Sequence, residues 1–454
     1  MRTFPVLATL ALVSCARAQN THPPLADRFY FPSGLGFVAV PGSLNGVLYV
    51  ANSNYDRRYD HGSVMAVSLD AVRDGNGNGL PVLGAPVASA GPAQFPALNL
   101  GAQAFTVIQT FAGRVGQYTL PDGRQRLFIP SQGEKNPLQI IDANADALTC
   151  LFTDPAASTN CLTNAPSLSA NANTPSSAGV PAAPQPWDVA IASDGQAFVT
   201  HVYGADSPPG TQKNIESYLV TFNAEAPPRT IPDNSFLLLD NAGSWDVVPG
   251  RRYAYVSGIF PQPSTGSAPD VLVRMVDRSG SGLVVYPQLR GQFQALQARG
   301  IALSADEQRL YLVTRTPDAL LVLHINGATS DAPSLLVERI VPLPSGPMEI
   351  RMLPRAGRGD LLAITCEGSG SLVFYDNDLG DLASEVPGVG LQPADLAVDI
   401  RPGNQARVYV SDEAGGRVAV VDVPDLNSPQ TARLVAEVGQ PQTCLIQPTD
   451  PSCK

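Results

Sequence analysis

The stretch that decides the fold is Pro186-Trp-Asp-Val-Ala-Ile-Ala-Ser-Asp-Gly-Gln-Ala-Phe-Val-Thr200, in which two short apolar segments flank a polar turn. The same order recurs along the chain, at Pro32–Asn52, Ser244–Ser257, Ala298–Thr314, Pro347–Thr365 and Pro393–Ser411. A third apolar segment, often ending in Asp, and a more variable fourth one follow in most copies. Runs of β-branched and aromatic residues bounded by Gly, Pro, Asn and Asp are typical of short antiparallel strands.

Radial repetition of such units predicts a β-propeller, because one unit cannot bury its own faces and must pack against its neighbours. The equivalent positions 188, 246, 299, 349 and 395 are separated by 58, 53, 50 and 46 residues, which suits one blade for each interval. With a further unit at 105–144, we expect seven four-stranded blades, closed by pairing of N- and C-terminal segments. A count of six or eight is left open. The predicted domain spans residues 19–443, with flexible insertions at 80–100 and 155–185.

The first residues predict export. Phe4–Val13 is an apolar run too short to span a bilayer, and it follows Met1-Arg2, as in a cleaved signal peptide at 1–18. Leu12-Val13-Ser14-Cys15 matches a lipobox, which would lipidate Cys15, whereas Ala16-Arg17-Ala18 matches an ordinary cleavage site. We expect an outer-membrane lipoprotein facing the periplasm or the cell surface. A periplasmic or secreted protein without lipid is the alternative.

The cysteines fit an oxidising compartment. Cys150 and Cys161 bracket one short loop, and Cys444 and Cys453 bracket another, so we expect two local disulfides, the second closing a tail at 444–454. Cys366 is left as a buried thiol. The net charge of −11 argues against nucleic acid as a partner. We expect a monomer whose partner is an envelope protein, a glycan or a small ligand.

Three groups of residues are candidates for a site. The repeat alignment places a charged residue at the start of each innermost strand, with Gly34 or Gly36 as the counterpart in the first unit. These candidates for the channel mouth are Asp188, Asp246, Arg299, Glu349 and Asp395. Converging carboxylates would bind a cation or act as acid and base, whereas recurring acidic residues also cap turns and bond backbone amides.

The second and third groups lie in loops. Asp60, His61 and His201 belong to loops expected on the same face, as an acid–base pair or as solvated recognition residues. Asp74-Gly-Asn76-Gly-Asn78-Gly matches the first half of a calcium loop, but position twelve is Ala85 rather than Glu. An Asn-Gly turn without Ca²⁺ explains the same residues.

The segments Leu48-Tyr-Val-Ala-Asn52, Tyr255-Val-Ser257 and Val408-Tyr-Val-Ser411 resemble the YVTN-type propeller repeats of the lactonase-like superfamily. The resemblance covers most of residues 30–440 and implies a seven-bladed propeller. It implies less about function, because the family holds cell-envelope proteins, binding propellers and sugar-lactone hydrolases. No complete catalytic motif stands in the sequence. We therefore expect a binding or scaffold module acting through its channel face, with a lactone hydrolase using the acidic mouth as the alternative.

Overall fold

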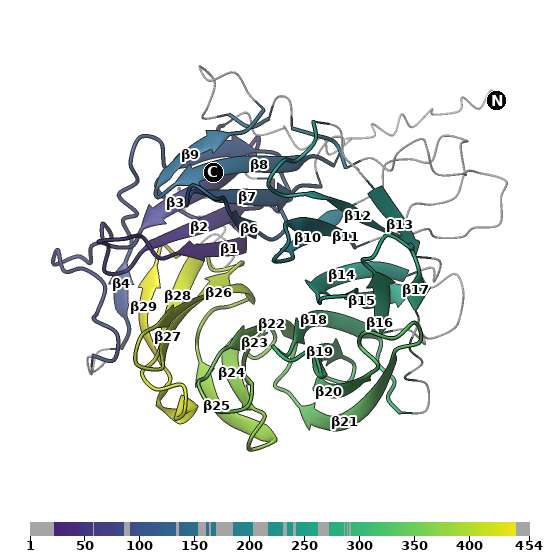
Figure 1. Ribbon diagram of the computed structural model, residues 1–454. Helices are drawn as coiled ribbons and strands as arrows, with labels where there is room; N and C mark the ends of the chain where they lie inside the picture. Colours follow the sequence, from purple (N-terminus) through teal and green to yellow (C-terminus); the bar gives the residue numbers. More distant parts are fainter. Residues whose placement is uncertain are drawn as a thin grey trace, which may run out of the picture.

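The computed structural model describes residues 22–57, 59–85, 91–132, 136–152, 160–162, 165–168, 185–202, 217–229, 234–238, 242–261, 272–285, 287, 289 and 292–441. Seven antiparallel sheets surround one axis, so the chain is a seven-bladed β-propeller, as predicted (Figure 1). The first blade lies beside the last, and the ring is closed.

The first three blades follow one another along the N-terminal half of the chain. Blade 1 comprises β1 (Pro32–Val38), β2 (Val47–Asn52), β3 (Gly62–Ser68) and β5 (Phe105–Ile108). Blade 2 comprises β6 (Gly116–Thr119), β7 (Gln125–Pro130), β8 (Leu138–Asn144) and β9 (Ala147–Cys150). Blade 3 comprises β10 (Pro186–Ile191), β11 (Gln196–His201), β12 (Ser217–Asn223) and β13 (Asn234–Leu238).

The remaining four blades complete the ring. Blade 4 comprises β14 (Ala242–Pro249), β15 (Tyr253–Pro261), β16 (Val273–Asp277) and β17 (Val284–Val285). Blade 5 comprises β18 (Gln297–Leu303), β19 (Arg309–Arg315), β20 (Ala319–Asn326) and β21 (Ser334–Pro342). Blade 6 comprises β22 (Pro347–Leu353), β23 (Leu361–Cys366), β24 (Ser371–Asp376) and β25 (Asp381–Pro387). Blade 7 comprises β26 (Pro393–Arg401), β27 (Gln405–Asp412), β28 (Arg417–Val423), a 3₁₀ turn η3 (Pro429–Thr431), β29 (Arg433–Val438) and β4 (Ala93–Phe95).

The middle strands are largely apolar and buried because each blade packs on both of its faces. Every residue of β23 and β24 is buried, whereas the outermost strand β21 is mostly exposed, with only Leu335 and Val341 buried. Burial on both faces explains why continuous apolar runs, rather than strict alternation, mark the repeats in the sequence.

Ring closure uses a segment from inside the first blade. Strand β4 lies between β3 and β5 in the chain, yet it pairs in parallel with β29 as a fifth strand of blade 7. Phe95 of β4 is 1% exposed and packs with Val438 of β29. Next to the axis, Phe37 of blade 1 stacks on Tyr409 of blade 7 at 5.4 Å. The prediction that N- and C-terminal segments pair is confirmed, and the pairing strand comes from the expected insertion at 80–100.

The cysteine predictions have separate outcomes. Cys150 and Cys161 form a disulfide with a Cα–Cα distance of 5.4 Å, as predicted. This bond indicates an oxidising compartment outside the cytoplasm. Cys366 is a buried free thiol. Cys15, Cys444 and Cys453, like most of the predicted insertion at 155–185, lie outside the described residues. Within the described part of the chain, no helix is long and apolar enough to cross a membrane.

Candidate functional site

The innermost strands begin with a bulge that sets the position of the predicted acidic residues. In β10, Pro186 pairs with His201, but Val189 pairs with Val199, so the register shifts between them. The same shift occurs in β14, β18, β22 and β26. Since a bulge leaves a residue outside the ladder, its N–H needs another acceptor. A Ser or Thr hydroxyl on the second strand accepts it, as Thr200 Oγ1 does from the Asp188 N–H at 3.1 Å.

The register corrects the sequence alignment in blade 5. Ile301 pairs as Val189 and Val247 do, so Gly300, and not Arg299, occupies the position equivalent to Asp188 and Asp246. Arg299 lies one residue earlier, and its guanidinium carbon is 3.9 Å from the centre of the Trp245 ring. A slip of one residue turns a side chain to the other face of a strand. Arg299 therefore occupies the strand position of Trp187 and Trp245 rather than that of the four carboxylates.

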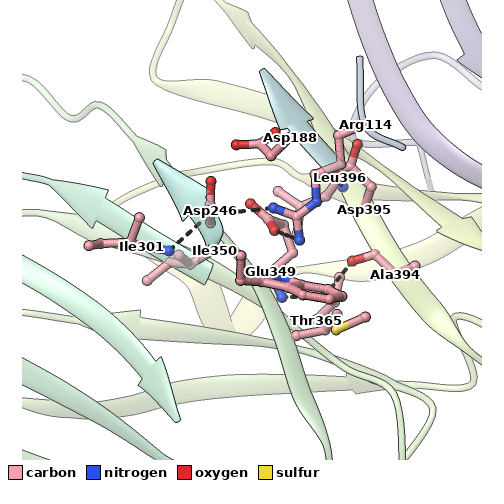
Figure 2. Close-up of polar contacts among 12 residues, drawn as sticks. Arg114, Asp188, Asp246, Ile301, Glu349, Ile350, Thr365, Ala394, Asp395 and Leu396 are labelled. Carbon is pink, nitrogen blue, oxygen red and sulfur yellow. Dashed lines mark hydrogen bonds and ion pairs between the residues drawn. The ribbon is translucent and has the colours of Figure 1, made fainter. Parts of the chain in front are cut away.

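The four predicted carboxylates meet on the axis around one arginine that was not predicted. Arg114 precedes β6 and forms ion pairs with Glu349 and, at 3.4 Å, with Asp246 Oδ2 (Figure 2). Its side chain is 2% exposed, and the charges of Asp188 and Asp395 also act on it. A residue of blade 2 thus reaches across the axis to blade 6.

Arg351 completes what we call the axial charge layer. This layer consists of Arg114, Asp188, Asp246, Glu349, Arg351 and Asp395. Arg351 Nη1 donates to Glu349 Oε1 and, at 3.1 Å, to the Ile350 carbonyl, while Nη2 contacts Asp395 Oδ1 at 3.4 Å. The side chain of Arg351 is 35% exposed, whereas that of Glu349 is 0% exposed. Arg351 is therefore the member of the layer that solvent reaches.

Two of the carboxylates also join neighbouring blades through the backbone. Asp246 Oδ2 accepts the Ile301 N–H of blade 5 at 3.0 Å (Figure 2). In the same way, Asp395 Oδ2 accepts the Leu35 N–H of blade 1 at 2.8 Å. The inner edge of each innermost strand lacks a partner strand, so these amides need acceptors from elsewhere. Asp246 and Asp395 therefore bond backbone amides, which is one of the two roles that the sequence left open for the recurring acidic residues.

The charge balance of the layer favours retained protons. Four carboxylates, each at most 4% exposed, face two guanidinium groups. Burial, followed by the charge of Asp246, raises the pKa of Asp188 well above its ordinary value. Burial raises the pKa of Glu349 to about 8, although Arg114 and Arg351 oppose this shift. Because four carboxylates face only two cations, the excess negative charge also raises the proton affinity of these two buried groups.

Large side chains pack beside the axial charge layer, at the end where the innermost strands begin. Trp187 and Trp245 lie with ring centres 4.7 Å apart and pack with Val202 and Met348. Arg114 lies 5.8 Å from the Trp245 ring centre, so this apolar group adjoins the charge layer. Among the described residues, no group of three or more His, Cys, Asp or Glu side chains is arranged to hold a metal ion. The arrangement supplies a rigid centre for the ring rather than an accessible acid–base pair.

The loop after β2 forms a second candidate site, at the end of the molecule where the innermost strands begin. Tyr55 is 65% exposed and stands edge-on to Phe111, with ring centres 5.6 Å apart. Phe31 lies 6.2 Å from Tyr55, and the Arg57 guanidinium carbon lies 5.1 Å from the Phe111 ring centre. We call Phe31, Tyr55, Arg57 and Phe111 the rim cluster. The sequence marked this loop as polar and aromatic, but Phe111 comes from the connection between blades 1 and 2.

The predicted histidines have different surroundings. His61 Nδ1 lies 2.9 Å from Asp60 Oδ1, and both side chains are 32% exposed in the β2–β3 loop that also carries Tyr55 and Arg57. His201 is 0% exposed at the end of β11, where its N–H donates to Ser244 Oγ at 3.0 Å. Asp60 and His61 therefore form a surface pair, while His201 belongs to the interior between blades 3 and 4.

The candidate calcium loop has its carboxylate engaged by its own backbone. Asp74 Oδ1 accepts the N–H groups of Asn76 and Asn78 at 2.9 and 2.8 Å, and Oδ2 accepts Asn78 Nδ2 at 2.9 Å. These bonds lower the pKa of Asp74, with the Asn78 side chain as the largest cause. The geometry is that of an Asx turn, the metal-free alternative considered from the sequence.

A cavity of about 260 Å³ lies on the axis, on the side of the charge layer away from the rim cluster. Its walls come from β1, β22 and β26 and from the start of β6. The lining residues are Leu35, Gly36, Phe37, Val115, Gln117, Arg351, Met352, Leu396, Ala397 and Val398. We call this cavity the axial pocket. The repeat analysis gave no indication of it.

Comparison with known proteins finds only distant similarities. No family model and no curated protein matches the chain. Similar solved structures include AztD from Citrobacter koseri, with 11% identity over 90% of this chain and 87% of that one, and a TM-score of 0.43. Hydrazine synthase of Kuenenia stuttgartiensis has 12% identity over 90% and 98%, with a TM-score of 0.47. The dihydro-heme d1 dehydrogenase NirN has 14% identity over 92% and 67%, with a TM-score of 0.45. At these values the similarity carries no argument about function.

Proposed function

We propose that the protein is an exported binding propeller that recognises a glycan through the rim cluster. The observation that carries this proposal is the exposure of Tyr55, which is 65% accessible while its ring rests edge-on against Phe111. An exposed aromatic face with charged neighbours offers a sugar both an apolar stacking surface and hydrogen-bonding groups. Arg57 supplies donors, and the Asp60–His61 pair supplies both donors and acceptors.

The support beneath Tyr55 is rigid, which lowers the entropy lost on binding. The Asn54 side chain donates to the Tyr59 carbonyl at 2.8 Å and accepts the Tyr59 N–H at 3.0 Å. Phe31, Asn54, Arg57 and Phe111 all have positive φ, between 51° and 56°. Such backbone costs about 1–3 kcal/mol per residue and is concentrated at binding sites. Its occurrence at four residues in and beneath the rim cluster supports a recognition role.

The alternative of a lactone hydrolase has less support. An acid–base pair must touch its substrate, but the carboxylates of Asp188, Asp246, Glu349 and Asp395 are at most 4% exposed. Asp246 and Asp395 are also bound to backbone amides. The net charge of −11 disfavours nucleic acid as the ligand. Lactone hydrolysis stays a prediction that a direct assay of the purified protein can test.

The test is binding of the purified protein to a panel of bacterial envelope polysaccharides. We expect Tyr55→Ala to weaken binding about tenfold or more, taking as a guide the roughly 1–3 kcal/mol that a nucleobase gains by stacking on an aromatic ring. The matched control is Leu44→Ser, because Leu44 is 82% exposed in the β1–β2 turn at the opposite end of the blade. Equal affinities of both variants and the wild type, or binding of no polysaccharide, would count against the proposal.

We further propose that the mature protein is attached to the outer membrane by lipid at Cys15. The lipobox Leu12–Cys15 supports this proposal, and the disulfide supports export. Metabolic labelling with an alkyne fatty acid in a bacterial host should label the wild type and not Cys15→Ser. The control variant Cys366→Ser should keep the label. Labelling that persists in Cys15→Ser would exclude this anchor.

A further inference from the structure

We propose that the axial pocket is a second binding site, which takes a small monocarboxylate with an apolar body and holds its carboxylate on Arg351. The site lies across the charge layer from the rim cluster, so this inference does not depend on the glycan proposal. Four blades contribute to its walls, and the volume of about 260 Å³ sets the size of the ligand. Because a cavity of about 150 Å³ holds benzene, the pocket has room for roughly ten non-hydrogen atoms.

The free donors of Arg351 define the ligand's polar group. A guanidinium carries five N–H donors. Nη1 uses its two on Glu349 Oε1 and the Ile350 carbonyl, and Nη2 uses one on Asp395. Among the described residues, the Nε–H and the second Nη2–H have no partner. These two groups form a side-on fork that matches a carboxylate in bidentate fashion.

The fork is held in place before a ligand arrives. Glu349 and Asp395 fix the far side of the guanidinium, and both are themselves fixed, by Arg114 and by the Leu35 N–H respectively. Arg351 lines the pocket, and its side chain is 35% exposed, so we infer that the unused fork faces the cavity. A fixed donor pair loses little side-chain entropy when it binds.

The remaining walls of the pocket suit the apolar part of such a ligand. Leu35, Phe37, Val115, Met352, Leu396 and Val398 supply the apolar lining. The second polar group is Gln117, whose Nε2 donates to the Phe37 carbonyl at 3.0 Å and to Gln125 Oε1 at 2.8 Å. Gly36 leaves space beside it, since a Cβ there would lie 3.0 Å from Gln117 Oε1. One charged anchor in an apolar cavity is the usual composition of a small-molecule site.

The experiment compares benzoate with benzamide, which has the same shape without the charge, by calorimetry on the full mature chain. We expect benzoate to bind in the millimolar range or tighter and benzamide to bind about ten- to hundredfold more weakly, as for a lost charge-assisted hydrogen bond. Val398→Phe should abolish benzoate binding by filling the pocket, at a site three residues beyond Asp395 in β26. Val82→Phe is the matched control, because Val82 is 78% exposed and does not line the pocket.

Arg351→Lys tests the fork itself and should remove the preference for benzoate over benzamide. If that variant does not fold, Val398→Phe still decides the matter. Absence of benzoate binding to the wild type, or equal binding to Val398→Phe and Val82→Phe, would overturn the site. Equal affinity for benzoate and benzamide would overturn the role of Arg351. The glycan proposal has its own readout, because Tyr55→Ala should leave benzoate binding unchanged.

Discussion

The buried Glu349 should make the stability of the propeller depend on pH in a direction opposite to that of an ordinary ion-paired carboxylate. Burial raises its pKa in the folded state from 4.5 to about 8. Between these values the folded chain keeps a proton that the unfolded chain releases. The free energy of unfolding therefore falls as the pH rises, by about 1.4 kcal/mol per pH unit for one proton. From pH 5 to pH 8 the free energy of unfolding therefore falls by about 4 kcal/mol in total.

The perturbation is Glu349→Gln, which has the shape of the protonated side chain and no titration. We expect the variant to gain about 4 kcal/mol of stability relative to the wild type as the pH rises from 5 to 8. For a chain of this size that corresponds to roughly 5 °C in the unfolding midpoint. Because both proteins share all other titrating groups, the difference reports Glu349 together with its effect on the nearby Asp188. Denaturant unfolding at several pH values measures it.

A matched comparison is Glu413→Gln. Glu413 is half-buried, and burial raises its pKa to about 7. The stability difference for this variant should therefore stop growing about one pH unit earlier. The reasoning would be refuted if Glu349→Gln were less stable than the wild type by a constant amount of about 3–5 kcal/mol at every pH. That result would mean that Glu349 stays ionised and paired with Arg114 and Arg351.

Three further perturbations test other parts of the fold. Arg114→Met should lower the free energy of unfolding by about 3–5 kcal/mol in denaturant titrations, because it leaves buried carboxylates without their cation. Arg124→Met, at an exposed position, should leave the unfolding midpoint unchanged, and equal effects of the two variants would contradict the stabilising role of Arg114. Reduction of the disulfide, or Cys150→Ser, should cost about 2–4 kcal/mol, and an unchanged midpoint under reducing conditions would show that the bond adds nothing. Phe95→Ala should cost about 3–5 kcal/mol and expose the β3–β5 connection to limited proteolysis, whereas resistance to protease would mean that β4 does not close the ring.

Much of the fold was predictable because the information is local. A segment such as Leu361–Cys366 is buried at every position and apolar at all but Thr365, since the blade that contains it is covered on both faces. Turn residues separate such segments at nearly constant spacing, and this spacing predicted the blades. The Cys150–Cys161 disulfide was also predictable, because its partners lie close together in the chain.

The closure and the cavity were not predictable from local patterns. Strand β4 is only three residues long, Ala93-Gln94-Phe95, and it pairs with a strand from the far end of the chain. Nothing in its own sequence distinguishes it from a surface loop. The axial pocket arises between four blades, each of which supplies only two or three of its lining residues. Features of this kind depend on how the units pack and not on the units themselves.

The sequence by itself therefore determined the strands, their repetition and the recurrence of acidic residues beside the axis. Only the tertiary structure decided what those residues do. A one-residue bulge placed Gly300 where Arg299 was expected, because a single step along a strand reverses the side chain. Arg114, from a blade with a weak repeat, met Glu349 across the ring. The raised pKa of Glu349 follows from burial and from charges on other blades, and these effects sum over the whole ring, which no single repeat encodes.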